Sequence, residues 1–258
     1  MAAAAAGELY RARLEHRTID SLPESMVPTT TDDGYAIAAA WADHADWEVV
    51  GWKIGCTSRA AQEMLSVAQP IGGRVFAPFL HHSPAVVAAS DFTAPLVEGE
   101  FAFALDADLP ARDRPYERAE VEAAIASVHP AIEIVDTRFS NFIRAGAPNL
   151  IADCSANGAL ILGPAMRDWR GIDLGAAAVT MSIDGMTVGA GTGADVHGHP
   201  LDALTWLVEL LSQSGVGLRA GQVVTTGTCT GAVPLPAGST AVADHGPLGT
   251  VEVTLRSP

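Results

Sequence analysis

The stretch LVEGEFAFAL at residues 96–105 constrains the fold more than any other part of the sequence. Its alternating apolar residues are typical of a β-strand with at least one buried face. Side chains two residues apart in a strand point to the same face, so Glu98 and Glu100 share one face. Ala102 and Ala104 continue that face, and both are small and apolar. A solvated face would still explain two glutamates on their own, because exposed charges are common on half-buried strands.

A third glutamate interrupts a second apolar strand, AIEIVD, at residues 131–136. Burying an unpaired carboxylate costs several kcal/mol, so Glu133 needs a cation or strong hydrogen-bond donors. Three carboxylates that converge from two strands would form a site of hard oxygen ligands, which Mg²⁺, Mn²⁺ and Ca²⁺ prefer and zinc does not. We therefore predict that Glu98, Glu100 and Glu133 bind a metal ion, with coordination positions left for water or substrate.

A lysine in the strand EVVGWKIG at residues 48–55 is the next candidate. A lysine in an apolar strand is most often an edge residue whose charged end reaches water. Beside a metal pocket, Lys53 could instead carry a proton or anchor an anion. The glycine turn that follows ends at Ser58, which offers a hydroxyl and backbone amides at a helix start. Such a helix start suits a carboxylate.

Two further segments combine polar residues with glycine. IADCSANGALILG places Asp153 before an apolar strand, and TTGTCTGAVPLPAG places Thr228 and Thr230 in a loop bounded by glycines. Ordinary turn chemistry explains each of these residues taken alone. His199 stands at a helix start, and we expect it to cap that helix or support the structure rather than to take part in catalysis.

The remaining pattern predicts a mixed α/β protein in which strands outnumber helices and the sheet is mixed or mainly antiparallel. We expect helices at residues 8–16, 32–44, 58–67, 117–128 (stopped by Pro130) and 199–215. We expect a hairpin at Asp184-Gly185 and final strands at 222–227, 239–245 and 250–256. The strict strand–helix–strand alternation, the glycine fingerprint and the P-loop of nucleotide-binding folds are missing.

No repeat or low-complexity linker divides the chain. We therefore predict a single catalytic domain over residues 1–258, with an N-terminal helical segment of about 1–47 packed on a sheet-rich core of 48–258. A chain of 258 residues is at the upper end of what one domain holds.

The net charge indicates which binding partners the protein can have, and the cysteines indicate its cellular compartment. The net charge of −15 argues against nucleic acid and anionic membranes and fits a protein that binds a small ligand. No apolar run approaches the roughly 18 residues of a membrane span, and the opening segment lacks the features of a signal peptide. The three cysteines are far apart and form no CxxC, which indicates free thiols in a reducing compartment. We therefore expect a cytoplasmic protein.

Together these motifs resemble those of the 2-keto-4-pentenoate hydratase / 4-oxalocrotonate decarboxylase family, within the fumarylacetoacetase superfamily. The family's order and spacing are found for GWKIGCTS, the VEGE pair, HPAIEIVD, IADCSANG, GHPLDALTWL and GQVVTTGTCTGAVPLPAG. The resemblance runs from about residue 30 to the C-terminus. It implies a sheet-rich, largely antiparallel α/β fold like that of the C-terminal part of fumarylacetoacetase, with flanking helices, and it implies a homo-oligomer.

The resemblance also implies roles for individual residues. The three glutamates would hold a divalent metal, Mg²⁺ or Mn²⁺. The lysine of the family's KIG motif falls on Lys53, and the aspartate of its A-D-N motif falls on Asp153, although the next residue is Cys154 instead of asparagine. We expect catalytic roles for this lysine and this aspartate. The family's carboxylate-binding hydroxyl best matches Thr230, and we expect Ser58 to bind substrate with it.

The sequence departs from the family at one place. Family hydratases have an acidic residue in a pattern like G-x-L-x-D-x-M, whereas this chain has Ala77-Pro78 there, within GGRVFAPFL. If that acid delivers a proton in the hydratases, this protein lacks it. Either His81 or His82 would have to take its place, or the chemistry would differ.

The resemblance implies a metal-dependent lyase of the hydratase type in the catabolism of aromatic compounds. Its substrate would be a 2-hydroxydienoate or 2-oxo-enoate acid, similar to 2-keto-4-pentenoate. The alternatives are a 4-oxalocrotonate-type decarboxylase, a fumarylacetoacetase-like hydrolase, and a protein without catalysis that only binds a metal and 2-oxo acids.

Overall fold

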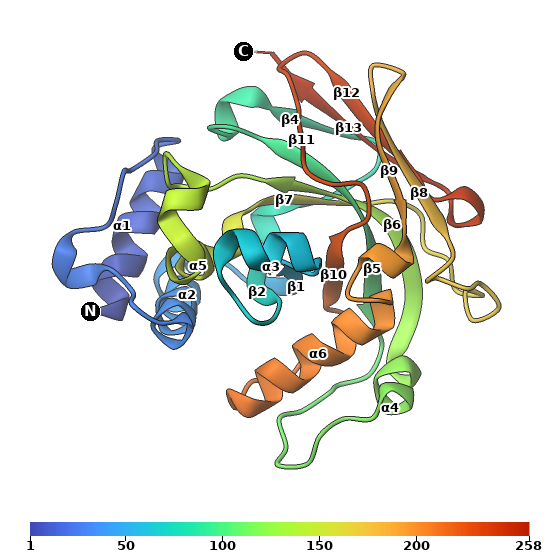
Figure 1. Cartoon of the computed structure of the whole chain (residues 1–258), viewed down its shortest axis with the longest axis horizontal. Coiled ribbons are helices and arrows are strands. Elements are labelled where there is room, and N and C mark those ends of the chain that lie inside the picture. The colour runs from blue at the N-terminus through green and yellow to red at the C-terminus, as the bar shows by residue number, and fades with distance from the viewer. Residues whose placement is uncertain (258) are drawn as a thin grey trace.

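Two β-sheets form most of the molecule (Figure 1). The computed structural model describes residues 1–257, apart from the side chains of residues 42 and 43, so the last residue of the predicted domain lies outside the described residues. The larger sheet has the order β2-β1-β10-β5-β6-β7-β3, with β11 paired to β5, and the smaller sheet has the order β4-β13-β12-β8-β9. Both contain parallel and antiparallel pairs, which confirms the mixed α/β class.

The elements have the following bounds. The larger sheet consists of β1 (Val49–Gly55), β2 (Ile71–Phe76), β3 (Leu80–His82), β5 (Leu96–Leu105), β6 (Ile125–Val135), β7 (Asn157–Leu162), β10 (Val223–Thr228) and β11 (Val233–Pro234). The smaller sheet consists of β4 (Ala85–Ala88), β8 (Ala178–Ile183), β9 (Met186–Thr192), β12 (Thr240–Asp244) and β13 (Thr250–Arg256). The helices are α1 (Ala2–Leu14), α2 (Thr31–Ala45), α3 (Arg59–Leu65), α4 (Arg118–Ala123), α5 (Phe142–Ala152) and α6 (Pro200–Gln213).

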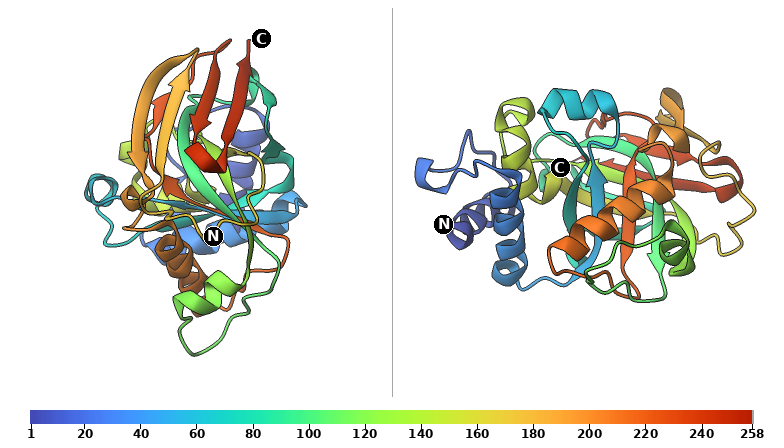
Figure 2. Two further views of the ribbon diagram at one scale, coloured as in Figure 1. Left: turned by 90° about the vertical axis from the view of Figure 1, so that its right-hand side faces the viewer. Right: turned by 60° about the horizontal axis from the view of Figure 1, so that its bottom comes forward.

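The helices cover different parts of the larger sheet. Helices α1, α2 and α5 gather at one end of the molecule, and α6 crosses β1 and β10 (Figure 2). The smaller sheet packs on the other side of β5 and β6, where its residues share an apolar core with theirs. Among residues 1–257, no helix is long and apolar enough to cross a membrane.

Helix starts follow the capping signals in the sequence. The Thr30 hydroxyl accepts a hydrogen bond from the backbone N–H of Asp33, and the Asp33 carboxylate accepts one in return from the backbone N–H of Thr30, which begins α2 with a capping box. At α6, Nδ1 of His199 accepts from the backbone N–H of Leu201 at 3.1 Å. The expected capping role of this histidine is therefore confirmed.

The two faces of β5 are both buried. Phe101 and Phe103 pack in the main core with α6. On the glutamate face, Ala102 is fully buried and packs in a second cluster with Ala131 and Leu160. The face that carries the glutamates is therefore not a solvated face, which rules out the ordinary explanation of the two charges.

The helix expected at 117–128 is wrong in its second half. Helix α4 ends at Ala123, strand β6 begins at Ile125, and Pro130 lies inside that strand, opposite Phe101 of β5. Pairing of β6 with β5 and β7 buries Ile125 and Val128, and this long-range burial outweighs the local helix preference of an alanine-rich segment.

Candidate active site

The three predicted metal ligands converge. Glu98 on β5 lies directly opposite Glu133 on β6, and Glu100 follows two residues along β5 on the same face. One carboxylate oxygen from each of the three residues lies within 4.8 Å of the others. Glu100 and Glu133 are fully buried, whereas Glu98 is partly exposed and lines a cavity.

Burial raises the pKa of all three carboxyl groups, and repulsion between carboxylates adds to this at Glu98 and Glu100. Burial raises the pKa of Glu98 to about 7; the charge of Glu133 adds to this, and Lys53 opposes it. Burial also raises the pKa of Glu100 well above its usual range, together with repulsion from the other two glutamates. Burial raises the pKa of Glu133 as well, against the attraction of Lys53. The cluster is therefore short of positive charge.

One carboxylate oxygen of Glu100 lacks a hydrogen-bond donor. Oε2 of Glu100 accepts a hydrogen bond from the backbone N–H of Gly227 at 2.9 Å, but its buried Oε1 has no hydrogen-bond donor among the described residues. A buried carboxylate oxygen without a donor is costly and needs an explanation. Lys53 brings one positive charge against three carboxylates. An all-oxygen set of this kind fits a hard divalent cation.

Lys53 is buried in β1 beside the cluster. Its Nζ lies 3.1 Å from Oε2 of Glu133 and donates to the backbone oxygen of Ser155 at 3.0 Å. Burial opposes the charge of the ammonium group, but the nearby carboxylates outweigh burial and raise its pKa. An ammonium group has three N–H donors, so one is left beyond these two contacts. Lys53 therefore faces the cavity as a cation that can still donate.

The carbonyl that accepts from Lys53 belongs to an unusual turn. Cys154, Ser155 and Ala156 have φ angles of 52°, 55° and 59°, in the left-handed region that residues other than glycine rarely adopt. The Ser155 hydroxyl donates to the backbone oxygen of Gly72 at 2.7 Å, and a Cβ at Gly73 would collide with the Cys154 carbonyl. The backbone of the turn therefore packs closely against β2, where a side chain at Gly73 would not fit. In this position the Ser155 carbonyl points toward Lys53.

Asp153 secures this turn and does not line the cavity. Its buried carboxylate accepts hydrogen bonds from Nε of Arg138 at 2.6 Å, from the backbone N–H of Arg138 at 2.8 Å and from the Thr137 hydroxyl at 2.7 Å. The structure therefore brings Asp153 to Arg138 and not to the glutamates. The cysteine that follows it in place of asparagine is buried.

Two groups that the sequence analysis missed hold carboxylates in position. Nδ2 of Asn157 donates to Oε1 of Glu133 at 3.0 Å, and the backbone N–H of Gly227 binds Glu100. Gly227 has a φ of 99°, and a Cβ there would collide with the side chain of Thr57, so only glycine fits. The signal for Asn157 was its place beside an apolar strand, since a buried amide needs a partner.

A cavity of about 500 Å³ opens from Lys53 and Glu98 and extends between α3 and α5. Ser58 lines it and caps α3, because its hydroxyl accepts from the backbone N–H of Ala61 at 3.2 Å. Its hydroxyl hydrogen is not used in this contact. Ser58, Lys53 and Glu98 are therefore predicted site residues that share one cavity.

Thr230 lies behind the cavity wall. Its hydroxyl oxygen accepts from the backbone N–H of Gly99 at 3.0 Å, so it supports the strand between the two glutamates. Thr228 lines the cavity instead, together with Thr57. Thr228, two residues earlier than expected, therefore lines the cavity in place of Thr230.

The position of the missing family acid does not line this cavity either. Ala77 follows the end of β2, whereas Lys53 pairs with Gly73 near the middle of that strand. His81 and His82 lie on β3, at the edge of the larger sheet beside β7. None of these residues is part of the cavity wall. Ala77, Pro78 and the two histidines therefore all lie outside the cavity wall of this chain.

Comparison with known proteins identifies the family. The family described as fumarylacetoacetate (FAA) hydrolase C-terminal matches residues 77–256. The chain belongs to the FAA hydrolase C-terminal family. This FAA hydrolase family member is 34% identical over 235 residues to a 2-hydroxyhexa-2,4-dienoate hydratase of Comamonas testosteroni, covering 89% of this chain and 88% of the relative. It is also 34% identical to a 2-keto-4-pentenoate hydratase of Burkholderia vietnamiensis, covering 98% and 96%.

A solved structure shares the whole fold of this FAA hydrolase family member. A 4-oxalocrotonate decarboxylase from Pseudomonas putida G7, complexed with magnesium and adipate, matches with a TM-score of 0.91 and 29% identity. The match covers 100% of this chain and 97% of the decarboxylase. The expected fumarylacetoacetase-like fold and family are therefore confirmed.

Proposed function

We propose that this protein is a metal-dependent hydro-lyase that adds water to a small 2-hydroxydienoate or 2-oxo-enoate acid in the breakdown of aromatic compounds. The observation that carries the proposal is the convergence of Glu98, Glu100, Glu133 and Lys53 at one end of a cavity. The hydratases among the relatives support this reaction, since their printed substrates are acids of this class.

The three glutamates would hold the metal, which we propose to be Mg²⁺ or Mn²⁺. The orphaned Oε1 of Glu100 and the all-oxygen donor set support a hard divalent ion. When bound, the ion supplies positive charge that attracts the substrate carboxylate and C2 oxygen and stabilises negative charge on that oxygen. The similar decarboxylase structures contain magnesium or calcium.

The chain's own residues bind and orient the acid. Lys53 remains charged and donates its free N–H to the carboxylate end of the substrate. The hydroxyl of Ser58 faces the same space and can donate a second hydrogen bond. We propose that Asp153 acts as a positioning residue, because its bonds to Arg138 fix the turn whose carbonyl holds Lys53. We propose the same indirect role for Thr230.

The reaction adds one water molecule to the substrate. The enol O–H of the 2-hydroxydienoate loses a proton while C5 gains one, which gives a 2-oxo-3-enoate. The oxygen of water then bonds to C4, and a proton is added at C3. The product is a 4-hydroxy-2-oxo acid. A cationic Lys53 beside the carboxylate and C2 oxygen favours both steps, because negative charge moves onto the C2 oxygen in each of them.

Decarboxylation of a 4-oxalocrotonate-type acid is the second candidate. The similarity over the full chain to a 4-oxalocrotonate decarboxylase supports it. Negative charge develops on the C2 oxygen in both hydration and decarboxylation. The metal ligands and Lys53 would stabilise it in either case, so they do not distinguish the two reactions.

We also propose a cytoplasmic location, a homo-oligomer and a single catalytic domain. The three cysteines are free thiols, which supports a reducing compartment. The family match over residues 77–256 supports one catalytic unit in this part of the chain.

The test is turnover of 2-hydroxypenta-2,4-dienoate with Mg²⁺ or Mn²⁺, with the product identified by NMR. We expect a 4-hydroxy-2-oxo acid to form, and we expect metal removal by a chelator to abolish the reaction. Metal binding without turnover of any 2-oxo or 2-hydroxydienoic acid would show that the protein only binds such ligands.

A further inference from the structure

A β-bulge at Gly158 turns the side chain of Asn157 toward the glutamate cluster. Leu160 on β7 lies opposite Glu133 on β6. Further along, Asn157 lies opposite Val135, and the pairing skips Gly158. Opposite residues point to the same face, so Asn157 and Leu160 share the face of Glu133 although they are three residues apart. Regular alternation would place residues 158 and 160 on that face instead. The bulge shifts the alternation by one residue, which lets the Asn157 amide donate to Glu133 at 3.0 Å.

Arg13 of α1 binds the two carbonyl groups of this bulge. Its Nη1 donates to the backbone oxygen of Asn157 at 2.6 Å, and its Nη2 donates to that of Gly158 at 2.5 Å. Successive carbonyls of a regular strand point in opposite directions, so one guanidinium reaches both only because the strand is bulged. Arg138 approaches the Asn157 oxygen at 3.5 Å, which is too long for a strong hydrogen bond. The shorter bonds at the bulge therefore come from Arg13.

Packing fixes the position of Arg13. Its guanidinium lies 3.6 Å from the centre of the Phe79 ring. Apolar residues of α1, among them Ala5 and Leu9, share one core cluster with residues of α2 and α5. A bulge takes backbone groups out of the sheet ladder, and a buried carbonyl without a donor is costly. Helix α1 therefore stabilises the bulge through a single side chain.

We propose that Arg13 is a positioning residue of the metal site, through which α1 holds the bulge in the shape that orients Glu133. The proposal rests on the proposed metal site and adds to it a residue outside the segment 77–256 that the family model matches. The coupling is reciprocal, so a metal ion bound at Glu133 favours the bulged form of β7 and, with it, the packed position of α1.

Calorimetric titration with Mn²⁺ tests the route from Arg13 to the metal. Arg13→Met removes both donors and keeps a side chain against Phe79, and we expect Mn²⁺ affinity to fall about three- to tenfold. Arg11→Met is the matched control, because Arg11 is exposed on the same helix and pairs with Glu8. In a protein that carries Asn157→Ala, the amide that transmits the effect is gone, so Arg13→Met should not change the affinity further.

Two results of this cycle would overturn the proposal. One is equal Mn²⁺ affinity of Arg13→Met and Arg11→Met, since a residue that only stabilises the fold lowers the melting temperature without changing the affinity of the folded protein. The other is the same loss of affinity on Arg13→Met with and without the Asn157 amide, because the effect would then bypass the bulge.

A spectrum of the metal-free protein separates this proposal from the proposed function, which a wild type without Mn²⁺ affinity would contradict. The side-chain NH₂ signals of Asn157 in a ¹H–¹⁵N spectrum are identified by their loss in Asn157→Ala. Arg13→Met should shift them, because the bond to Glu133 changes, and Arg11→Met should not. Unshifted signals in Arg13→Met would overturn the positioning role whether or not the metal binds.

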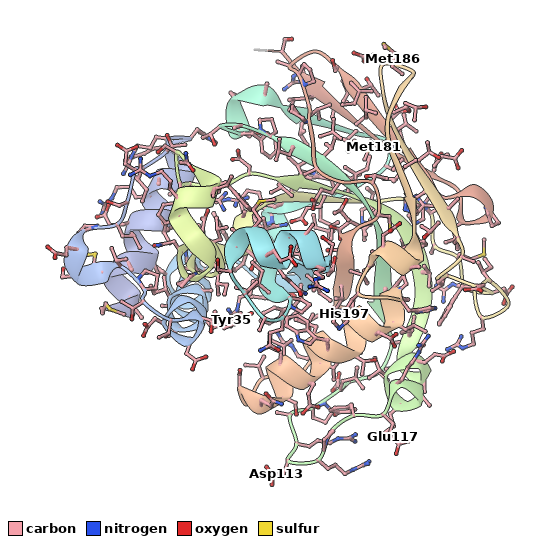
Figure 3. All side chains as sticks on the ribbon, viewed as in Figure 1. Tyr35, Asp113, Glu117, Met181, Met186 and His197 are labelled. Carbon is pink, nitrogen blue, oxygen red and sulfur yellow. The ribbon has the colours of Figure 1, made fainter. Side chains whose placement is uncertain are left out.

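Hydrogen exchange of the wild type tests the reciprocal effect without any variant. Mn²⁺ should slow exchange of the α1 amides at least about threefold relative to those of the β8–β9 hairpin. Figure 3 shows Met186 at the outer end of this hairpin, away from α1, which makes the hairpin an internal control. Equal slowing in both segments would show a general stabilisation and would overturn the coupling of α1 to the metal.

Discussion

Asn157 donates a hydrogen bond from Nδ2 to Oε1 of Glu133 at 3.0 Å, across the pair formed by β6 and β7. On its other oxygen, Glu133 contacts Lys53 at 3.1 Å. The amide and the ammonium together fix the orientation of a carboxylate that lies directly opposite Glu98. A residue outside the cavity wall thus orients one carboxylate of the cluster.

Asn157→Ala should therefore weaken metal binding. Loss of such an outer hydrogen bond typically lowers metal affinity about 10- to 100-fold. Titration calorimetry with Mn²⁺ measures the change. Asn149→Ala is the matched control, because that amide donates to Ala145 within α5 and not to the cluster. Equal Mn²⁺ affinity in the two variants would contradict the positioning role.

Glu100→Gln should separate metal binding from folding. Burial holds the pKa of Glu100 well above its usual range, so a neutral amide should not lower the melting temperature without metal. The same variant should lose the metal-dependent rise in melting temperature. In the wild type, Mn²⁺ at 100 times its Kd should stabilise the folded protein by about 2.7 kcal/mol. A rise equal to that of the wild type would show that Glu100 is not a ligand.

Lys53→Met should abolish turnover but not metal binding. The change removes the donor that faces the substrate, and we expect kcat to fall at least about 100-fold. It also removes a positive charge beside the carboxylates, so Mn²⁺ should bind as tightly as before or more tightly. Steady-state kinetics and calorimetry on the same preparation measure both effects. Unchanged turnover would refute the role of Lys53.

Gly227→Ala should be more destabilising than Gly221→Ala. Both glycines have positive φ angles, 99° and 86°, so alanine costs about 1 to 2 kcal/mol of backbone strain at either position. Only at Gly227 would the new Cβ also collide with Thr57, since nothing lies within 4 Å at Gly221. Urea unfolding of the two variants isolates the collision. Equal free energies of unfolding would show that the contact relaxes without cost.

Cys56 should react with iodoacetamide slowly at neutral pH and faster as the pH rises toward 11. It lines the cavity, and burial raises the pKa of its thiol to about 11, so the reactive thiolate is scarce below that pH. Cys154 and Cys229 are buried and should stay unmodified in the folded protein. Mass spectrometry after alkylation locates the label. Oxalate with Mn²⁺ should protect Cys56, and equal labelling with and without them would place the ligand elsewhere.

Local patterns in the sequence determined several features of this protein. Strand alternation placed Glu98 and Glu100 on one face, and an isolated charge among apolar residues identified Glu133. The capping residue His199 marked one helix start. Each of these follows from neighbours within a few residues, since side-chain direction in a strand and the free amides of a helix start are local properties.

Other features were decided only by the tertiary structure. The register of β5 and β6 set Glu98 opposite Glu133, and the same pairing carried the strand past Pro130. The Asp153 carboxylate accepts a hydrogen bond from Arg138, and the Thr230 hydroxyl accepts one from the backbone N–H of Gly99. Both residues stand in motifs that had suggested direct contact with substrate. The cavity wall joins residues of α3, α5 and β10, which are far apart in sequence. Buried polar groups bind whichever partners the packing brings near, and those partners depend on contacts between distant segments that no local pattern contains.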